Sequence, residues 1–122
     1  TVDLDKETQN VLDANFVFYF NHLAADIHET AKSKGWWDKE RNDGEMICLM
    51  HSELSEALEG LRHGNPPSEH IPDFSAVEEE LADVVIRVCD LAGWLGIDLG
   101  EAIRVKHAYN QTRPYRHGGK AL

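Results

Sequence analysis

The chain has 122 residues, of which 42% are hydrophobic and 28% are charged. This length and apolar content predict one globular domain over residues 1–122 and exclude wholesale disorder. The longest apolar runs, such as Phe16 to Phe20, are much shorter than the roughly 20 residues of a membrane span. With 12 Lys and Arg against 22 Asp and Glu, the formal net charge is −10, which disfavours a nucleic acid polymer as a partner.

The N-terminus and the two cysteines indicate the cellular compartment of the protein. No segment combines a basic stretch, an apolar stretch and a small-residue cleavage site, so we expect no secretory signal and a cytoplasmic protein without a membrane partner. Cys48 and Cys89 both lie within apolar helical patterns. We interpret them as reduced core thiols rather than as a disulfide or a zinc site.

The first predicted element is a helix over about residues 8–34. The run FVFYF favours a strand by propensity, yet apolar residues recur every three or four positions across the whole segment, which favours a helix that ends near Gly35. These residues are Leu12, Phe16, Phe20, Leu23 and Ile27.

Three further helices are predicted by their capping residues. In each, a short polar side chain precedes the helix and a glutamate follows three residues later, so the side chain can cap free N–H groups while the glutamate reaches back. The pairs are Asn42 with Glu45, Ser75 with Glu78, and Asp98 with Glu101. The predicted helices are 43–63, 75–94 and 99–111, with a loop over 60–73 and a break at Gly96. The fold class is therefore all-α, a bundle of four to five helices.

The helix over 43–63 carries two acidic residues beside its apolar face. At about 100° per residue, seven apolar side chains fill an arc of about 120°, and Glu53 falls between Met46 at its edge and Leu49. Glu56 projects beside Leu49 from the adjacent turn. The apolar arc consists of Met46, Met50, Ala57, Leu61, Leu54, Ile47 and Leu58. An ionised carboxylate among such residues is costly unless it is paired or bound to a metal ion.

The helix over 75–94 repeats this pattern with Glu80 and Asp83 at the edge of its apolar face. If the two helices pack antiparallel, the two acidic pairs can face each other. Oxygen ligands suit Mg²⁺, or Mn²⁺ as a substitute, and leave coordination positions for water and a substrate phosphate. The alternative is that the acidic pairs are solvated surface of a non-catalytic helical interaction module. A ferritin-like di-iron centre needs Glu-x-x-His pairs, and no predicted helix supplies one.

The order of motifs along the chain resembles the MazG-like all-α nucleoside triphosphate pyrophosphohydrolases, relatives of dimeric dUTPases and dCTP pyrophosphatases. The resemblance rests on E-L-S-E (Glu53, Glu56), E-L-A-D-V-V (Glu80, Asp83) and K-H-A-Y-N-Q-T-R, and it runs from about Gly35 to Pro114. It implies that the four acidic residues bind Mg²⁺. As a separate hypothesis, one carboxylate, either Glu53 or Glu56, orients or deprotonates the attacking water, and the sequence does not choose between the two. The resemblance also implies hydrolysis of a (d)NTP to the (d)NMP and pyrophosphate, in a house-cleaning role against surplus or non-canonical dNTPs. A phosphoribosyl-ATP pyrophosphohydrolase-like enzyme is an alternative.

Phosphate-binding residues are expected on the last helix. Lys106, Asn110 and Arg113 are spaced four and three residues apart, so they share one face and form a local basic patch on an acidic protein. The resemblance implies that they hold the phosphates. Both cations could instead be ordinary charges near a helix C-terminus. Beyond the motif, a basic tail with Tyr115, Arg116, His117 and Lys120 could close over the triphosphate or simply be disordered.

Base-binding residues are expected in the loop before Arg41. Trp36 and Trp37 offer indole faces for stacking on a nucleobase, although adjacent tryptophans usually place one ring in a core or an interface. In dCTP pyrophosphatases a similar Trp precedes Arg-Asn, and His28 lies at about the spacing of their base-contacting His. The resemblance further implies a homodimer or homotetramer in which oligomerisation completes the bundle.

Overall fold

The protein is all-helical in the computed structural model, which describes residues 4–115. Four helices and no strand occur in this part of the chain, which confirms the predicted fold class. The helices are α1 (Lys6–Ser33), α2 (Asp43–Arg62), α3 (Ala76–Leu95) and α4 (Leu99–Gln111). Each helix boundary lies within two residues of its prediction. The basic tail from Arg116 lies outside the described residues.

The chain divides into two compact units. One comprises Leu23–Gly96, and the other comprises Thr1–His22 with Ile97–Leu122. Two such units can belong to one domain, so the single domain expected over 1–122 stays a prediction. None of the helices in the described segment combines the length and apolar content that crossing a lipid bilayer requires.

Local capping explains where α2 and α3 begin and where α3 ends. Asn42 accepts hydrogen bonds from the backbone N–H groups of Gly44 and Glu45, and Ser75 forms the predicted reciprocal capping box with Glu78. Helix α3 ends at Gly96, whose φ of 68° lies in the left-handed region that glycine adopts without strain.

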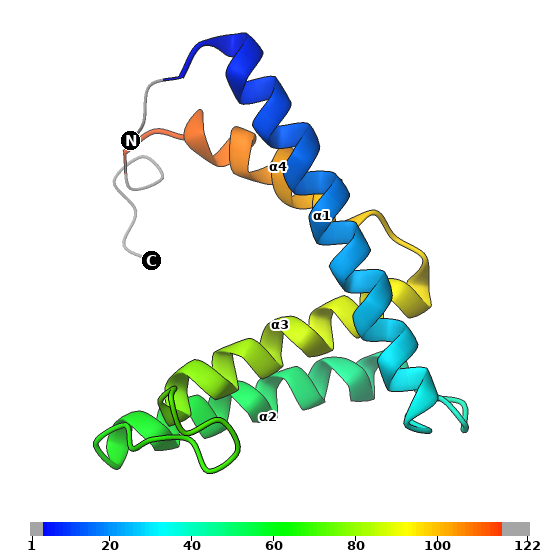
Figure 1. Cartoon of the computed structure of the whole chain (residues 1–122), viewed down its shortest axis with the longest axis vertical. Helices are drawn as coiled ribbons and strands as arrows, with labels where there is room; N and C mark the ends of the chain where they lie inside the picture. Colours follow the sequence, from blue (N-terminus) through cyan, green and yellow to red (C-terminus); the bar gives the residue numbers. More distant parts are fainter. Residues whose placement is uncertain (1–3, 116–122) are drawn as a thin grey trace. The chain divides into compact units, whose positions relative to one another are not determined.

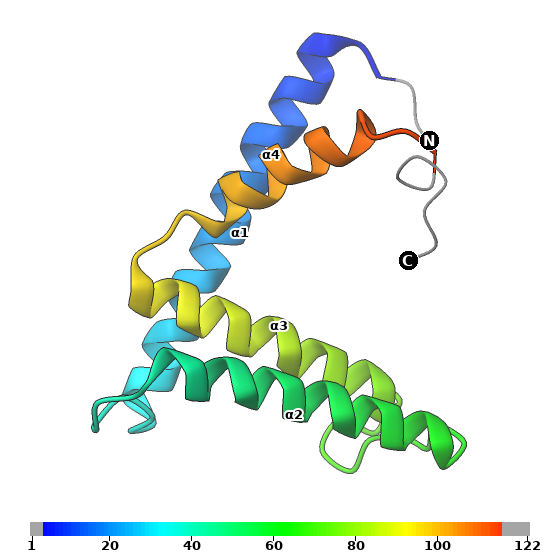
Figure 2. The same ribbon diagram turned by 180° about the vertical axis from the view of Figure 1, so that it is seen from behind.

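In the unit Leu23–Gly96, α2 and α3 lie side by side and antiparallel, as Figures 1 and 2 show from opposite sides. The loop between them is held against the start of α3. The Asn65 side chain accepts a hydrogen bond from the backbone N–H of Val77 at 3.0 Å, and Ser68 donates one to Glu79 at 2.8 Å. This arrangement gives α2 and α3 the antiparallel relation that the two acidic pairs require.

Only part of the predicted apolar arc on α2 is buried. Met46, Glu53 and Ala57 are buried, whereas the other side of the arc is 45–59% exposed. The exposed residues are Ile47, Leu54, Leu58 and Leu61. The expectation that both cysteines are core thiols is half wrong, because Cys89 is buried but Cys48 is exposed. An exposed apolar stripe of this length marks a surface that another chain can cover.

The last turns of α1 pack closely on α3 in the same unit. Ala24 and His28 are the buried residues of α1, and a Cβ added at Gly93 would lie 2.6 Å from both Cβ and Cγ of His28. A glycine at this position of α3 is therefore what permits the close approach of the two helices.

We expect Gly93→Ala to lower the free energy of unfolding by about 1–3 kcal/mol, because His28 is held by a hydrogen bond and has little room to move. Urea denaturation of the variant and the wild type measures this loss. Gly60→Ala is the matched control, since its Cβ would lie 3.3 Å from the nearest atom and the loss should be smaller. A Gly93→Ala protein as stable as the wild type would contradict this packing.

In the other unit, Asn21 joins the part of α1 that belongs to this unit to the start of α4. Its amide donates to Asp98 Oδ1 at 2.6 Å and accepts from the Gly100 backbone N–H at 2.8 Å. Asp98 also caps α4 by accepting from the Glu101 N–H. The carboxylate of Glu101 does not reach back to the cap as predicted, because it pairs with Arg104 on the next turn.

Candidate metal centre and nucleotide pocket

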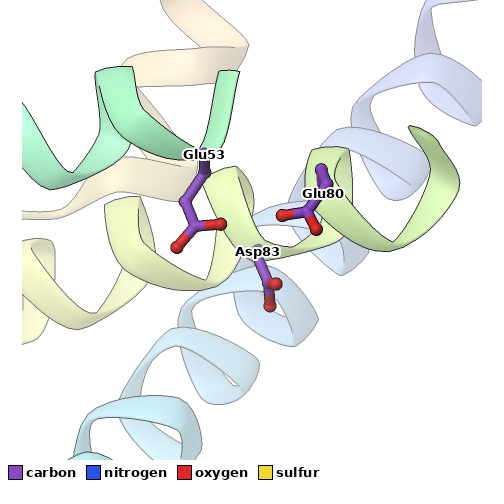
Figure 3. Close-up of side chains that lie close together, drawn as sticks. All are labelled: Glu53, Glu80 and Asp83. Carbon is purple, nitrogen blue, oxygen red and sulfur yellow. The ribbon is translucent and has the colours of Figure 1, made fainter. Parts of the chain in front are cut away.

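Three of the four predicted acidic residues come together between α2 and α3. Glu53 projects from α2 toward α3, while Glu80 and Asp83 project from neighbouring turns of α3 (Figure 3). One carboxylate oxygen from each lies within 4.8 Å of the others, so the three could hold a metal ion jointly. Glu53 is 8% exposed, which matches its predicted place inside the apolar arc.

The chemistry of Glu80 fits a cation at this position. Its Oε2 is buried and has no hydrogen-bond partner in the described part of the chain. Burial, followed by the neighbouring carboxylates of Glu53 and Glu56, raises the pKa of Glu80 to about 8. Burial is also the first reason why the pKa of Asp83 is raised, with the charge of Glu53 second. A divalent cation would satisfy the unpartnered oxygen and offset this repulsion.

Arg87 is a positively charged side chain that contacts the carboxylate cluster. Its Nε donates to Glu53 Oε1 at 2.8 Å, and both side chains are largely shielded from solvent. Burial acts to raise the pKa of Glu53, but the hydrogen bond from Arg87 and the neighbouring carboxyl group of Glu80 outweigh it and lower that pKa overall. Glu53 is therefore the member of the cluster that is most readily ionised.

Glu56, the fourth predicted ligand, is exposed at the edge of the cluster. It lies close enough to Glu53 and Glu80 to affect their pKa values, because its carboxyl group acts to lower the pKa of Glu53 and to raise that of Glu80. It is not among the three residues whose oxygens converge.

In a metal-free buffer, we expect the free energy of unfolding to fall as the pH rises from about 5 to about 8. Over this range the unfolded chain has lost the Glu80 proton, whose ordinary pKa is 4.5, while the folded chain still binds it. Raising the pH therefore favours the unfolded state. Glu80→Gln removes this titration, so its stability relative to the wild type should increase with pH. Urea denaturation in EDTA at several pH values tests this, and parallel profiles for the two proteins would contradict it.

A pocket of about 380 Å³ adjoins the carboxylates in the same unit. That volume falls in the range of small-molecule sites. Glu53, Asp83 and Arg87 line it together with Trp36, Arg41 and Asp90. The last turns of α1 add apolar and polar groups, including Ile27 and Thr30. Negative, positive and aromatic groups thus meet in one cavity beside the candidate metal centre.

The two adjacent tryptophans have different environments. Trp37 stacks on Trp94 with ring centres 4.6 Å apart and donates from Nε1 to Asp90 Oδ1 at 2.9 Å. Trp36 lines the pocket and is 54% exposed, with the guanidinium carbons of Arg41 and Arg87 at 5.7 and 6.0 Å from its ring centre. Trp36 therefore presents a half-exposed ring with two guanidinium groups near it, whereas Trp37 is engaged in the packing of the unit.

His28 is buried and bound to another side chain. Its Nδ1 lies 2.7 Å from Asp90 Oδ1, and its ring packs edge-on against Trp37 with centres 5.5 Å apart. It is not among the residues that line the pocket. A base contact from His28 stays a prediction, while its observed contacts orient Asp90.

The three predicted phosphate-binding residues lie on α4 and just after it, in the other unit. Lys106, Asn110 and Arg113 are all exposed, and the two cations flank the ring of Tyr109 at 4.6 and 5.9 Å. Their proximity to the carboxylates stays a prediction.

Sequence reasoning missed Arg87 and Asp90 as residues of the site. Both follow Asp83 on α3, at four and seven residues, which places them on the same helix face. That spacing was a usable signal, but a charged residue on a helix is usually solvated surface, and only the packing of α1 on α3 encloses these two.

Comparison with known proteins shows similarity to a phage enzyme. The chain is 34% identical over 76 residues to the dATP/dGTP diphosphohydrolase of cyanophage S-2L. The match covers 62% of this chain and 61% of the length of that relative. No protein-family model matches the sequence, and no solved structure matches it either.

Proposed function

We propose that this protein is a Mg²⁺-dependent nucleoside triphosphate pyrophosphohydrolase, which converts a (d)NTP and water to the (d)NMP and pyrophosphate. The observation that carries the proposal is the convergence of Glu53, Glu80 and Asp83, with an unpartnered buried oxygen, beside a pocket that Trp36 lines. The name of the cyanophage relative supports a dNTP substrate and a hydrolase acting on an acid anhydride. We further propose a cytoplasmic house-cleaning role against surplus or non-canonical dNTPs.

Glu53, Glu80 and Asp83 would hold Mg²⁺, with Glu56 as a fourth ligand and Mn²⁺ as a possible substitute. When bound, the metal ion supplies charge neutralisation for the phosphates and activation of water. The all-oxygen donor set favours these hard cations over zinc, which prefers nitrogen and sulfur ligands.

Side chains of the protein would act on the attacking water, the base and the phosphates. Arg87 keeps Glu53 ionised, so that Glu53 can orient the attacking water and accept its proton, a role that Glu56 could share. Trp36 offers its ring to the base, and Trp37 and His28 support the pocket from behind. The phosphates would be held by Lys106, Asn110 and Arg113.

We propose that a second copy of the chain covers the exposed stripe of Ile47, Leu54, Leu58 and Leu61. Leu81 and Val85 on α3 are each 48% exposed and add to the apolar surface of the helix pair. Burying such residues in an interface is favourable by about 25 cal/mol for each Å². A homodimer or homotetramer would thereby complete the helical bundle.

The activity is tested with a panel of NTPs and dNTPs in Mg²⁺, with EDTA as the metal-free control. We expect monophosphate and pyrophosphate as products, and no turnover in EDTA. Diphosphate and phosphate as products would contradict the proposed reaction. Turnover of a phosphoribosyl-linked nucleotide alone would contradict the dNTP substrate. A non-catalytic helical module would show neither metal binding nor stabilisation by nucleotides.

A further inference from the structure

The carboxylate of Asp90 has one oxygen fully engaged and one oxygen free. Oδ1 accepts hydrogen bonds from Trp37 Nε1 at 2.9 Å and from His28 Nδ1 at 2.7 Å, because a carboxylate can only accept. Oδ2 has no hydrogen-bond partner among the described residues, and it retains some solvent exposure. Asp90 itself is only 7% exposed and lines the pocket. The oxygen without a partner therefore belongs to a largely buried carboxylate in the wall of the pocket.

The two residues behind Asp90 hold it in place. Trp37 is fixed by its stack on Trp94, and His28 is fixed against Gly93, where α1 and α3 touch. A side chain whose position is set by two hydrogen bonds and by packed rings is preorganised for recognition. Nothing in the metal centre uses this carboxylate, since Glu53, Glu80 and Asp83 form the converging set.

The position of Asp90 along α3 suits contact with a base. Asp83, Arg87 and Asp90 are four and three residues apart on one helix face, so about 10 Å of helix axis separates Asp83 from Asp90. A nucleotide with its phosphates at the metal centre and its base near Trp36 would lie along this face, since the same pocket is lined by Asp83, Trp36 and Asp90.

We infer that Asp90 selects nucleotides by accepting a hydrogen bond from an exocyclic amino group of the base, an inference that rests on the proposed function. Adenine, guanine and cytosine carry such a group. A base with a carbonyl at that place, such as uracil, would bring its carbonyl oxygen against the Asp90 carboxylate oxygen. Both atoms only accept hydrogen bonds, so the buried carboxylate would lack a donor. Trp36 supplies stacking that every base can use, so it does not itself distinguish one base from another.

The test uses matched nucleotides on the wild-type protein. We expect the best dNTP substrate to be amino-bearing, and exchange of dATP or dGTP for dITP, or of dCTP for dUTP, to lower kcat/KM by about tenfold or more. A best substrate of dTTP, dUTP or dITP, or equal values within the relevant pair, would overturn the inference.

Variants then assign the preference to one residue. Asp90→Asn offers an amide that can donate as well as accept, so the preference should fall to roughly threefold or invert. Asp26→Asn is the matched control, because Asp26 lines the same pocket but is exposed, and it should keep the preference. If the preference is lost in Asp26→Asn and kept in a folded Asp90→Asn, the inference is wrong.

A binding measurement separates this inference from the proposed reaction. Calorimetric titration of the metal-free protein with dAMP, dGMP and dIMP should show weaker binding of dIMP by about tenfold. If dAMP or dGMP binds more tightly than dIMP but no dNTP is hydrolysed, the proposed reaction is wrong and the inference about base selection is supported. Turnover with equal binding of the three monophosphates would overturn the base selection alone.

Discussion

Glu53→Gln is expected to reduce turnover of a dNTP by more than about a hundredfold while the protein stays folded. Changing even the outer partners of a metal site costs about 10- to 100-fold in affinity or activity, and Glu53 is proposed both as a ligand and as the group that acts on water. The amide is nearly isosteric, but it carries no charge and cannot accept a proton. Initial rates in Mg²⁺ and circular dichroism measure the two outcomes.

Glu59→Gln is the matched control for Glu53→Gln, since Glu59 lies on the same helix and is exposed. Its activity should equal that of the wild type. Calorimetry with Mn²⁺ should show weaker binding for Glu53→Gln and unchanged binding for Glu59→Gln. Full activity of Glu53→Gln would remove Glu53 from the mechanism.

Leu58→Glu is expected to dissociate the proposed oligomer and to lower activity by tenfold or more, on the order of 1.4 kcal/mol or above. Leu58 is 49% exposed, so a charge there costs the isolated chain little, but it would be buried without a partner in an interface. Sedimentation velocity measures the oligomeric state, and rates at equal subunit concentration measure the activity.

Ser52→Glu serves as the control for Leu58→Glu, because Ser52 is exposed on the far side of α2 from the apolar stripe. It should leave both oligomeric state and activity unchanged. A wild-type protein that sediments as a stable, active monomer would contradict the interface itself.

The helices could be predicted closely because their ends depend on local chemistry. Asn42 and Ser75 cap the first free N–H groups of α2 and α3, and Gly96 allows the left-handed turn that ends α3. These effects involve residues three or four positions apart, which a sequence displays directly. The buried position of Glu53 was predictable for a similar reason, since helical periodicity alone places it among apolar neighbours.

Features that depend on packing between helices could not be predicted from the sequence. Periodicity describes one apolar arc on α2, but only the position of α3 decides that Met46 is buried and Leu58 exposed. Likewise, the sequence does not distinguish the two adjacent tryptophans. In the structure Trp37 stacks on Trp94, whereas Trp36 lines the pocket. The spacing of Asp90 from Asp83 is visible in the sequence, but the burial of Asp90 beside His28 depends on the approach of α1 to α3.

The most direct test of the proposed chemistry is hydrolysis of a dNTP in ¹⁸O-labelled water with Mg²⁺, followed by mass spectrometry of the products. If a water positioned by the carboxylates attacks the α-phosphorus, the label appears in the deoxynucleoside monophosphate and the pyrophosphate is unlabelled. A deoxynucleoside diphosphate as product, or label in the pyrophosphate, would contradict the proposed reaction.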